Sequence, residues 1–197
     1  MNALVQANLD VRLPLRFDSA GISYAVLSYR IQLSLVRLVS NVQHLSLLGC
    51  FVEYIYFGGE SKDQLPMFHN LKTLELGWNS CAARWDKTLL EILACSPNLE
   101  TPSFPEGFFA DLAYIQGGVA DLENQGWEST EATPLCFQSN LKRIVIQYYY
   151  GTTRELNIIK FFLQKASILH ELDICLSGIN YMFNSSVSSI ILFYFLG

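Results

Sequence analysis

The sequence predicts an α/β fold, a leucine-rich-repeat solenoid with parallel strands on one face and helices on the other. Aliphatic residues recur at the spacing L-x-x-L-x-L, these recurrences keep a period, and the segments between them carry helix signals. Clean matches begin at positions 42, 71, 141 and 169 and degraded ones at 4 and 99, so successive steps are 38, 29, 28, 42 and 28 residues. Because a single match arises easily by chance in an apolar chain, the repeated step of 28 or 29 residues is what favours a stacked array.

Residues 1–105 are predicted to form the leucine-rich repeats. A degraded first strand is expected near the N-terminus, followed by a helix that leads into the strand VQHLSL. The apolar face of this helix is expected to hold four residues: Leu35, Leu38, Val39 and Val42. After the strand that begins at Leu71, Asp86 is expected to cap a second helix, which a Ser-Pro pair ends before a degraded strand starts at Leu99.

Residues 106–133 are rich in glycine and acidic residues and are predicted to be an insertion or loop. Residues 134–176 are predicted to be a pair of repeats, two strands joined by a helix on which Thr152 and Glu155 form a capping box. The apolar face of that helix is expected to hold four residues: Leu156, Ile159, Leu163 and Ala166. Residues 177–197 lose the repeat and are predicted to be an atypical apolar tail without a helix cap or a partner strand.

Composition argues against several classes of partner. The net charge is -5 and no basic stripe is present, so no nucleic-acid partner is expected. The longest apolar run near an end, Ile190 to Leu196, is far short of the roughly 18 residues that a membrane span needs, so no membrane partner is expected. The five cysteines form no C-x-x-C pair and follow no secretory leader, which favours reduced thiols in a cytoplasmic or nuclear protein. No cofactor and no metal site are expected.

A distinctive combination of residues runs from Trp127 to Ile174. Its positions include a Pro-x-Cys-Phe motif and later aliphatic and aromatic residues: Trp127, Pro134, Cys136, Phe137, Leu141, Ile144, Ile146, Gly151, Glu155, Phe161, Phe162, Ala166, Leu169 and Ile174. With the repeats before it, this stretch resembles plant F-box proteins of the leucine-rich-repeat type that end in an FBD domain. The resemblance implies a non-catalytic protein-binding module, similar to the substrate-recognition part of an F-box subunit of a cullin-RING (SCF-type) ubiquitin ligase. The implied partner is a target protein of unknown identity, with the ligase adaptor as a second partner only if an F-box is present elsewhere.

The chain departs from this family pattern in two places. No segment resembling an F-box stands before the first repeat, and the FBD pattern is lost after Ile174. We therefore expect a product that lacks the F-box and is truncated at its C-terminus. The alternative is that the chain is a non-functional truncated fragment or splice product of such a protein. A repeat array that ends without a cap would leave a sheet edge exposed.

The candidate binding residues come from the strand alternation. Side chains that flank the core leucines of each strand are expected on the concave face of the array, which such proteins use to bind others. Tryptophan and tyrosine extend this face because they suit interface anchors. The tentative partner-binding set has eleven members: His44, Ser46, Thr73, Glu75, Trp78, Arg143, Val145, Gln147, Tyr149, Glu171 and Asp173. The alternative, that these are solvated polar positions that any such fold has, remains open.

Enzymatic catalysis is not expected. The chain has no G-x-S-x-G motif, phosphate loop or dinucleotide fingerprint. A less favoured alternative is a cysteine-dependent hydrolase, in which Cys95 or Cys136 would act with one of the three histidines, His44, His69 or His170. No metal-ligand spacing supports such a cluster, so no catalytic residue is assigned.

Overall fold

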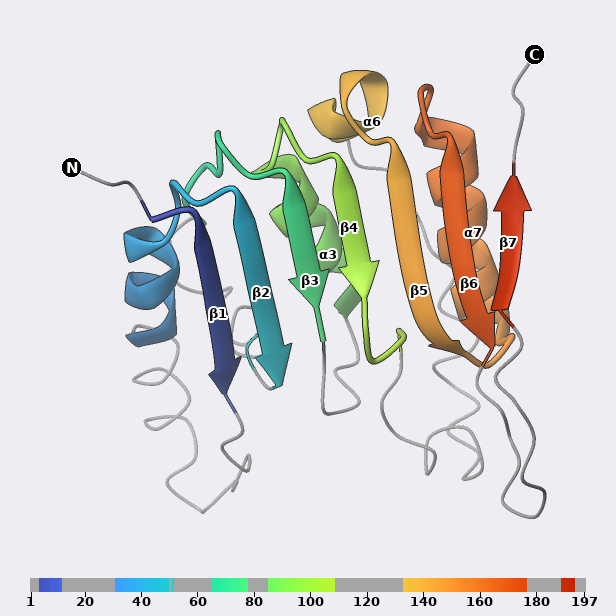
Figure 1. The fold of residues 1–197 in the computed structure, drawn as a ribbon, viewed down its shortest axis with the longest axis horizontal. Coiled ribbons are helices and arrows are strands. Elements are labelled where there is room, and N and C mark those ends of the chain that lie inside the picture. Colours follow the sequence, from blue (N-terminus) through green and yellow to red (C-terminus); the bar gives the residue numbers. More distant parts are fainter. Residues whose placement is uncertain are drawn as a thin grey trace.

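Seven strands form one sheet and lie side by side in chain order (Figure 1). The computed structural model describes residues 4–11, 31–49, 51, 65–77, 85–108, 133–176 and 189–193. The strands in these ranges are β1 (Gln6–Val11), β2 (His44–Gly49), β3 (Thr73–Leu76), β4 (Thr101–Phe104), β5 (Arg143–Tyr149), β6 (Glu171–Leu176) and β7 (Ser189–Phe193). Strands β1 to β6 are parallel, and β7 pairs antiparallel with β6.

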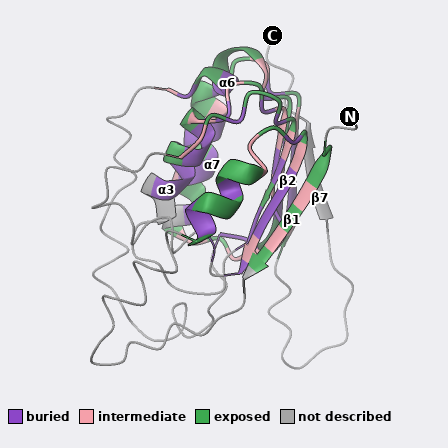
Figure 2. Cartoon of the chain, turned by 90° about the vertical axis from the view of Figure 1, so that its left-hand side faces the viewer, coloured by how far each residue is buried: buried purple, intermediate pink, exposed green. Residues whose placement is uncertain are grey.

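All the described helices lie on one face of the sheet (Figure 2). They are a helical segment at residues 31–38, α3 (Trp85–Ala94), α6 (Leu135–Ser139) and α7 (Thr153–Lys165). Each leads into the next parallel strand, because two parallel neighbours can be joined only by a connection that crosses over the sheet. The predicted α/β class is confirmed, with six parallel strands in one sheet and interleaved helices. None of the helices in the described ranges is long and apolar enough to cross a membrane.

The core is built from rows of apolar side chains that run across the sheet. In the first row, Leu45 pairs with Leu74, Leu74 with Pro102, and Ile144 with Leu172. The four aliphatic members are at most 2% exposed. Full burial of such a side chain contributes about 1.5–3 kcal/mol. The prediction that the L-x-x-L-x-L residues meet on neighbouring parallel strands is therefore confirmed.

Phenylalanines join the two ends of the core. Phe137 of α6 stacks on Phe162 of α7 with ring centroids 5.5 Å apart and planes 6° apart. Phe162 also meets Phe104 of β4 at 6.3 Å, and Phe104 meets Phe108 at 4.6 Å. These rings connect β4 to α6 and α7, so the predicted repeats before residue 105 and the predicted repeat pair after residue 134 share one core. The predicted domain boundaries stay a prediction, and most of the predicted insertion, residues 109–132, lies outside the described residues.

The predicted face of the first helix is only partly right, because Val39 packs against the core and Val42 is buried in it, but the two predicted leucines are exposed. Leu35 is 38% exposed and Leu38 is 79% exposed, whereas Leu33 and Val36 are buried in the core. The helical segment ends at residue 38, so Val42 reaches the core from the turn and does not fix the phase of the helix. The sequence LSLVRLV offers two overlapping apolar stripes, and packing against the sheet selected the other one.

The start of α7 confirms the predicted capping box. The Thr152 hydroxyl oxygen accepts a hydrogen bond from the Glu155 backbone N–H (3.2 Å), and the Glu155 carboxylate accepts one from the Thr152 N–H (2.9 Å). The predicted apolar face is only partly right, because Ile158 is fully buried while Leu156 is 42% exposed. The predicted cap of α3 is also wrong by a residue or more, since the helix begins at Trp85 and Asp86 lies inside it.

The prediction that the tail has no partner strand is wrong. Leu172 of β6 pairs with Leu192 of β7, and Ile174 pairs with Ile190. The run SIILF is rich in the β-branched and aromatic residues that favour strands, and β6 offers it an unpaired edge. The structure therefore covers the edge of β6 that was expected to be open, and the fragment hypothesis loses one of the observations that supported it.

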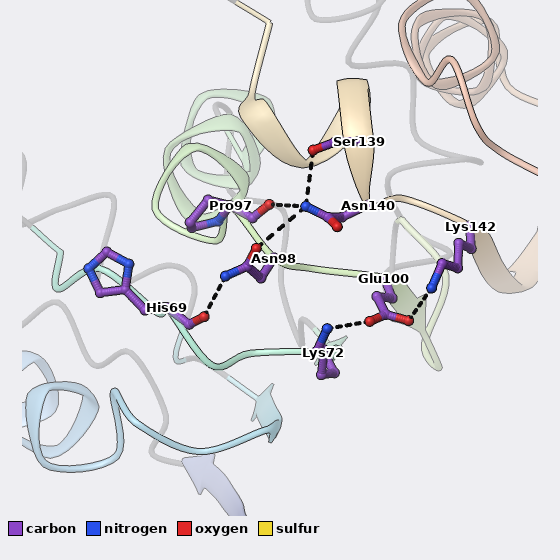
Figure 3. Close-up of polar contacts among 8 residues, drawn as sticks. All are labelled: His69, Lys72, Pro97, Asn98, Glu100, Ser139, Asn140 and Lys142. Atoms are coloured by element: carbon purple, nitrogen blue, oxygen red, sulfur yellow. Dashed lines mark hydrogen bonds and ion pairs between the residues drawn. The ribbon is translucent and has the colours of Figure 1, made fainter.

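Asparagines link successive turns on the side where the parallel strands begin (Figure 3). Asn98 donates its side-chain N–H to the His69 carbonyl (2.7 Å), and Asn140 donates to the Pro97 carbonyl (3.0 Å). Asn70 makes the equivalent bond to the Asn41 carbonyl at 3.4 Å. Each of these asparagines comes directly before the first aliphatic residue of a repeat, so the bond recurs with the repeat.

A second ladder on the same side consists of charged side chains. The Glu100 carboxylate accepts from Lys72 on one side and from Lys142 on the other, the latter at 2.8 Å. Hydrogen bonds from Lys142 and then Lys72 lower the pKa of Glu100 below its ordinary value. Because all three side chains are at least partly exposed, this network contributes little to stability.

Candidate protein-binding face

The helix-free face is the side of the sheet opposite the described helices, and its strand residues alternate with the buried rows (Figure 2). One row pairs His44 with Thr73 and, further along the sheet, Arg143 with Glu171. A second row runs without interruption through six strands by direct pairing: Asn8, Ser46, Glu75, Ser103, Val145 and Asp173. The register thus brings together candidate residues that are up to about 130 positions apart in the sequence.

Nine of the eleven predicted residues occupy positions on this face. They are His44, Ser46, Thr73, Glu75, Arg143, Val145, Gln147, Glu171 and Asp173. Trp78 lies outside the described residues. Whether any of the nine contacts a partner stays a prediction, since their shared face establishes only their position.

Tyr149 is placed differently from the prediction. The β5–β6 register shifts between Ile146 and Tyr149, and Tyr148 adopts a positive φ of 51°. This irregularity breaks the alternation, so Tyr149 packs against the core and Tyr148 is the exposed tyrosine. Burial, and secondarily the charge of Glu155, raise the pKa of Tyr149, which agrees with a position on the helix side. Simple counting along the strand could not anticipate the irregularity.

The charged residues at the β5–β6 end of the face pair with one another. Arg143 donates from Nε to Asp173 Oδ2 at 2.9 Å and lies 3.3 Å from Glu171 Oε2, and its Nη2 also bonds Asp173. These bonds raise the pKa of the guanidinium further above the neutral range. Partly exposed pairs of this kind contribute about 0.2–1 kcal/mol. With one guanidinium and two carboxylates, this end of the face carries a net negative charge.

The β1–β3 end of the face is hollowed. A depression of about 280 Å³ is lined mainly by Gln6, His44, Ser46, Thr73 and Glu75. His44 Nδ1 and Thr73 Oγ1 are 2.6 Å apart and share a hydrogen bond. Ser46 is buried, and its hydroxyl has no hydrogen-bond partner among the described residues. Four of the predicted candidates therefore line one depression, a grouping that the sequence did not predict because it depends on strand register.

The environments of two cysteines disfavour the hydrolase alternative. Burial raises the pKa of the Cys136 thiol to about 12, and burial together with the charge of Glu91 raises the pKa of Cys95. A nucleophilic thiol needs a lowered pKa, so neither group is suited to that chemistry. In the described ranges, no group of three or more His, Cys, Asp and Glu side chains could hold a metal ion. Cys50 and Cys81 lie outside the described residues.

The sequence interpretation missed the asparagine ladder, although its signal is visible in the sequence. Asparagine directly precedes the first aliphatic residue of four repeats, at positions 41, 70, 98 and 140. The ladder does not bind a partner itself. It fixes the turns that lead into β3, β4 and β5, and so sets the relative heights of the residues on the helix-free face.

Comparisons with known proteins agree with this architecture. The family model FBD matches residues 130–174. F-box/LRR-repeat protein At2g42730 of Arabidopsis thaliana is 31% identical over 182 residues, which are 89% of this chain and 36% of that protein. F-box protein At3g59150 of Arabidopsis thaliana is 32% identical over a stretch that covers 69% of this chain and 29% of that protein. F-box/LRR-repeat protein At3g58930 of the same plant is 31% identical over 72% of this chain and 28% of that protein.

The chain spans about a third of the length of these curated relatives. No solved structure matches it significantly. The FBD match covers α6, β5, α7 and most of β6, the part of the fold in which the phenylalanine cluster and the capping box lie. The chain thus contains an FBD domain and is homologous over most of its length to the F-box/LRR-repeat proteins of Arabidopsis thaliana.

Proposed function

We propose that residues 1–197 are a non-catalytic protein-binding module that acts as the substrate-recognition part of an F-box subunit of an SCF-type ubiquitin ligase. In this proposal the parallel sheet and its helices are a leucine-rich-repeat solenoid, and the helix-free face is its recognition surface. Homology to F-box/LRR-repeat proteins supports the proposal. So do the six parallel strands with interleaved helices, because stacked repeats use one extended face to bind other proteins.

One observation carries the proposal, the uninterrupted row of paired positions from Asn8 to Asp173 on a face without described helices. The row combines hydroxyl, carboxylate and aliphatic side chains over six strands, and an exposed tyrosine, Tyr148, stands near its end. A flat surface of mixed chemistry suits another macromolecule better than a small substrate, which usually binds in a deep cleft.

The proposed mechanism is scaffolded recognition. The helix-free face holds the target, and an F-box recruits the ligase adaptor, so the target is presented for ubiquitin transfer without chemistry by this chain. The three relatives are named as F-box proteins, which supports an F-box as the part that meets the adaptor. The described cysteines are free thiols, in agreement with a proposed location in the cytoplasm or nucleus.

Site-specific photocrosslinking tests the proposal. A photoreactive benzoylphenylalanine replaces Gln147 on the helix-free face or, as a matched control, Gln164 on α7, because both glutamines are exposed. Each variant, fused to the F-box of a relative, is irradiated in plant extract, and crosslinked proteins are then offered to a reconstituted ligase. We expect proteins that crosslink only from position 147 and that the ligase ubiquitinates. Equal crosslinking from both positions, or no ubiquitination of the captured proteins, would contradict the proposal.

A further inference from the structure

We propose that the depression over β1–β3 holds a cationic side chain, arginine or lysine, of the partner protein. This inference rests on the proposed function and specifies the chemistry of the target at one point of the helix-free face. It is carried by three features of the same depression: an unpartnered buried hydroxyl, an adjacent carboxylate, and a hydrogen bond that joins His44 to Thr73 in the wall.

The buried hydroxyl belongs to Ser46. Its side chain lines the depression and is 6% exposed, and its oxygen has no hydrogen-bond partner among the described residues. An unpartnered buried hydroxyl destabilises a fold, so its presence needs an explanation. Because its neighbours cover this oxygen, a donor in the depression would give it the missing partner only after the short Ser46 side chain rotates towards the ligand.

The carboxylate belongs to Glu75, which pairs directly with Ser46 across β2 and β3. Adjacent strands lie about 4.8 Å apart, so one N–H-rich group can reach both side chains. Glu75 is exposed, and no described cation pairs with it, since Arg143 is engaged by Asp173 and Glu171 at the other end of the same face. The depression therefore has an exposed carboxylate beside a covered hydroxyl, and neither has a donor among the described residues.

The surroundings favour a cation over other ligands. His44 and Thr73 bond to each other, so they do not compete for the carboxylate. Among the described positions of β2 to β6 on the helix-free face there are three carboxylates (Glu75, Glu171 and Asp173) and one guanidinium, an excess of negative charge that disfavours anionic partners. A bare metal ion does not fit, because no group of three potential ligands occurs among the described residues. A guanidinium or ammonium supplies the several N–H donors that the two acceptors need.

The volume of the depression, about 280 Å³, accepts the apolar stem of a long side chain as well as its charged head. Part of the lining at Leu45 is strand backbone, because the Leu45 side chain is buried in the core on the opposite face. Lysine and arginine both pack their methylene stems on apolar surface while their heads remain near water, which matches a shallow site of this kind. The same site would gain little from a purely apolar side chain, because that would cover Ser46 without giving it a partner.

Amide-resolved NMR titration of the whole chain tests the inference. The probes are N-acetyl-argininamide, N-acetyl-lysinamide and N-acetyl-norleucinamide, the last being an uncharged side chain of similar length. We expect the cationic probes to shift the amide signals of His44, Ser46, Thr73 and Glu75, and more weakly at high salt. The norleucine probe should leave these signals in place. Equal shifts with all three probes, or no shifts with the cationic ones, would overturn the inference.

Variants separate the two acceptors. Glu75→Gln should weaken the cationic probes about tenfold and Ser46→Ala about threefold, whereas Glu91→Gln on α3, the same charge change on the helix side, should leave affinity unchanged. A tenfold loss in Glu91→Gln would indicate a general charge effect and would also overturn the inference. Ser46→Ala removes an unpartnered hydroxyl, so it should fold at least as stably as the parent chain.

The same measurements distinguish this inference from the proposed function. If position 147 still captures ubiquitinated targets but the cationic probes do not bind, the depression is not a cation site and the proposed function stands. If the probes bind at Glu75 but position 147 captures no ubiquitinated target, the site is supported as a cation-binding depression and the proposed function fails.

Discussion

Replacing Leu74 with alanine tests the packing of the sheet most directly. Leu74 is fully buried and pairs with Leu45 on one side and Pro102 on the other. The change removes three carbon groups at about 0.8 kcal/mol each, and so loses about 2.4 kcal/mol of burial. A cavity between the sheet and the helices that cover it cannot collapse completely, which raises the expected loss to about 3–5 kcal/mol. Such a loss is a large fraction of the stability of a domain of this size.

The matched control is Leu38→Ala, the same chemical change at a residue that is 79% exposed. We expect less than about 0.5 kcal/mol there, because little apolar surface is lost and alanine favours a helix. Urea unfolding followed by circular dichroism gives both values if the slope with urea stays the same. A loss at position 38 as large as at position 74 would refute the assigned helix face and restore the stripe that the sequence predicted. Unfolding without a cooperative transition would favour the non-functional-fragment alternative.

Three further predictions concern polar and backbone features. Burial raises the pKa of Glu155, so between the unfolded and folded pKa values the folded state binds more protons and stability falls as the pH rises. Glu155→Gln should remove this dependence in urea titrations at pH 4 to 7, whereas Glu155→Ala should also lose the capping hydrogen bonds and cost about 2 kcal/mol at pH 4, and less at pH 7. Glu100 has a lowered pKa, so the stability that its ionised carboxylate contributes is present above the unfolded pKa and is lost as the pH falls through the folded pKa. Glu100→Gln should lower the free energy of unfolding by at most about 1 kcal/mol at low salt and by nothing measurable in 1 M salt. Gly107→Ala should lower the free energy of unfolding more than Gly151→Ala, although both glycines have positive φ (72° and 81°). A methyl carbon added to Gly107 would lie 2.8 Å from the Gln147 carbonyl oxygen, whereas one added to Gly151 would come no closer than 4.0 Å to a neighbouring atom. Similar losses of stability in the two variants would argue against a clash at Gly107.

The strands were predictable from the sequence because two constraints coincide in them. A residue such as Ile144 must be aliphatic to fill the core, and its repeat partner Leu172 must stand at the same offset to pair with it. Even the degraded match at Leu99 forms the strand β4, with Pro102 in a core position. The capping box was predictable for a similar reason, since both of its hydrogen bonds are local to four residues.

Helix phase and the tail were not predictable by the same reasoning. Leu33 and Leu35 both belong to plausible apolar stripes, and only the position of the helix over the sheet decides which is buried. The pairing of β7 depends on an edge of β6 that local sequence does not describe. Tyr149 shows a third limit, because the shift of register before it reverses the alternation on which its placement depended.

The candidate site, like the fold, was only partly predictable from the sequence. Positions on the helix-free face follow from alternation, but the depression follows from register between β1, β2 and β3, which the sequence gives only through the asparagine and backbone links of the turns. Core rows and turns are fixed by packing and hydrogen bonds, so substitutions there cost stability. Exposed members of the helix-free face, such as Glu75 and Gln147, carry no such cost and are free to be selected for recognition. Ser46 differs from these exposed residues, because it is buried and its hydroxyl has no hydrogen-bond partner among the described residues. A residue whose presence stability does not explain is the strongest indication of where on this face a partner binds.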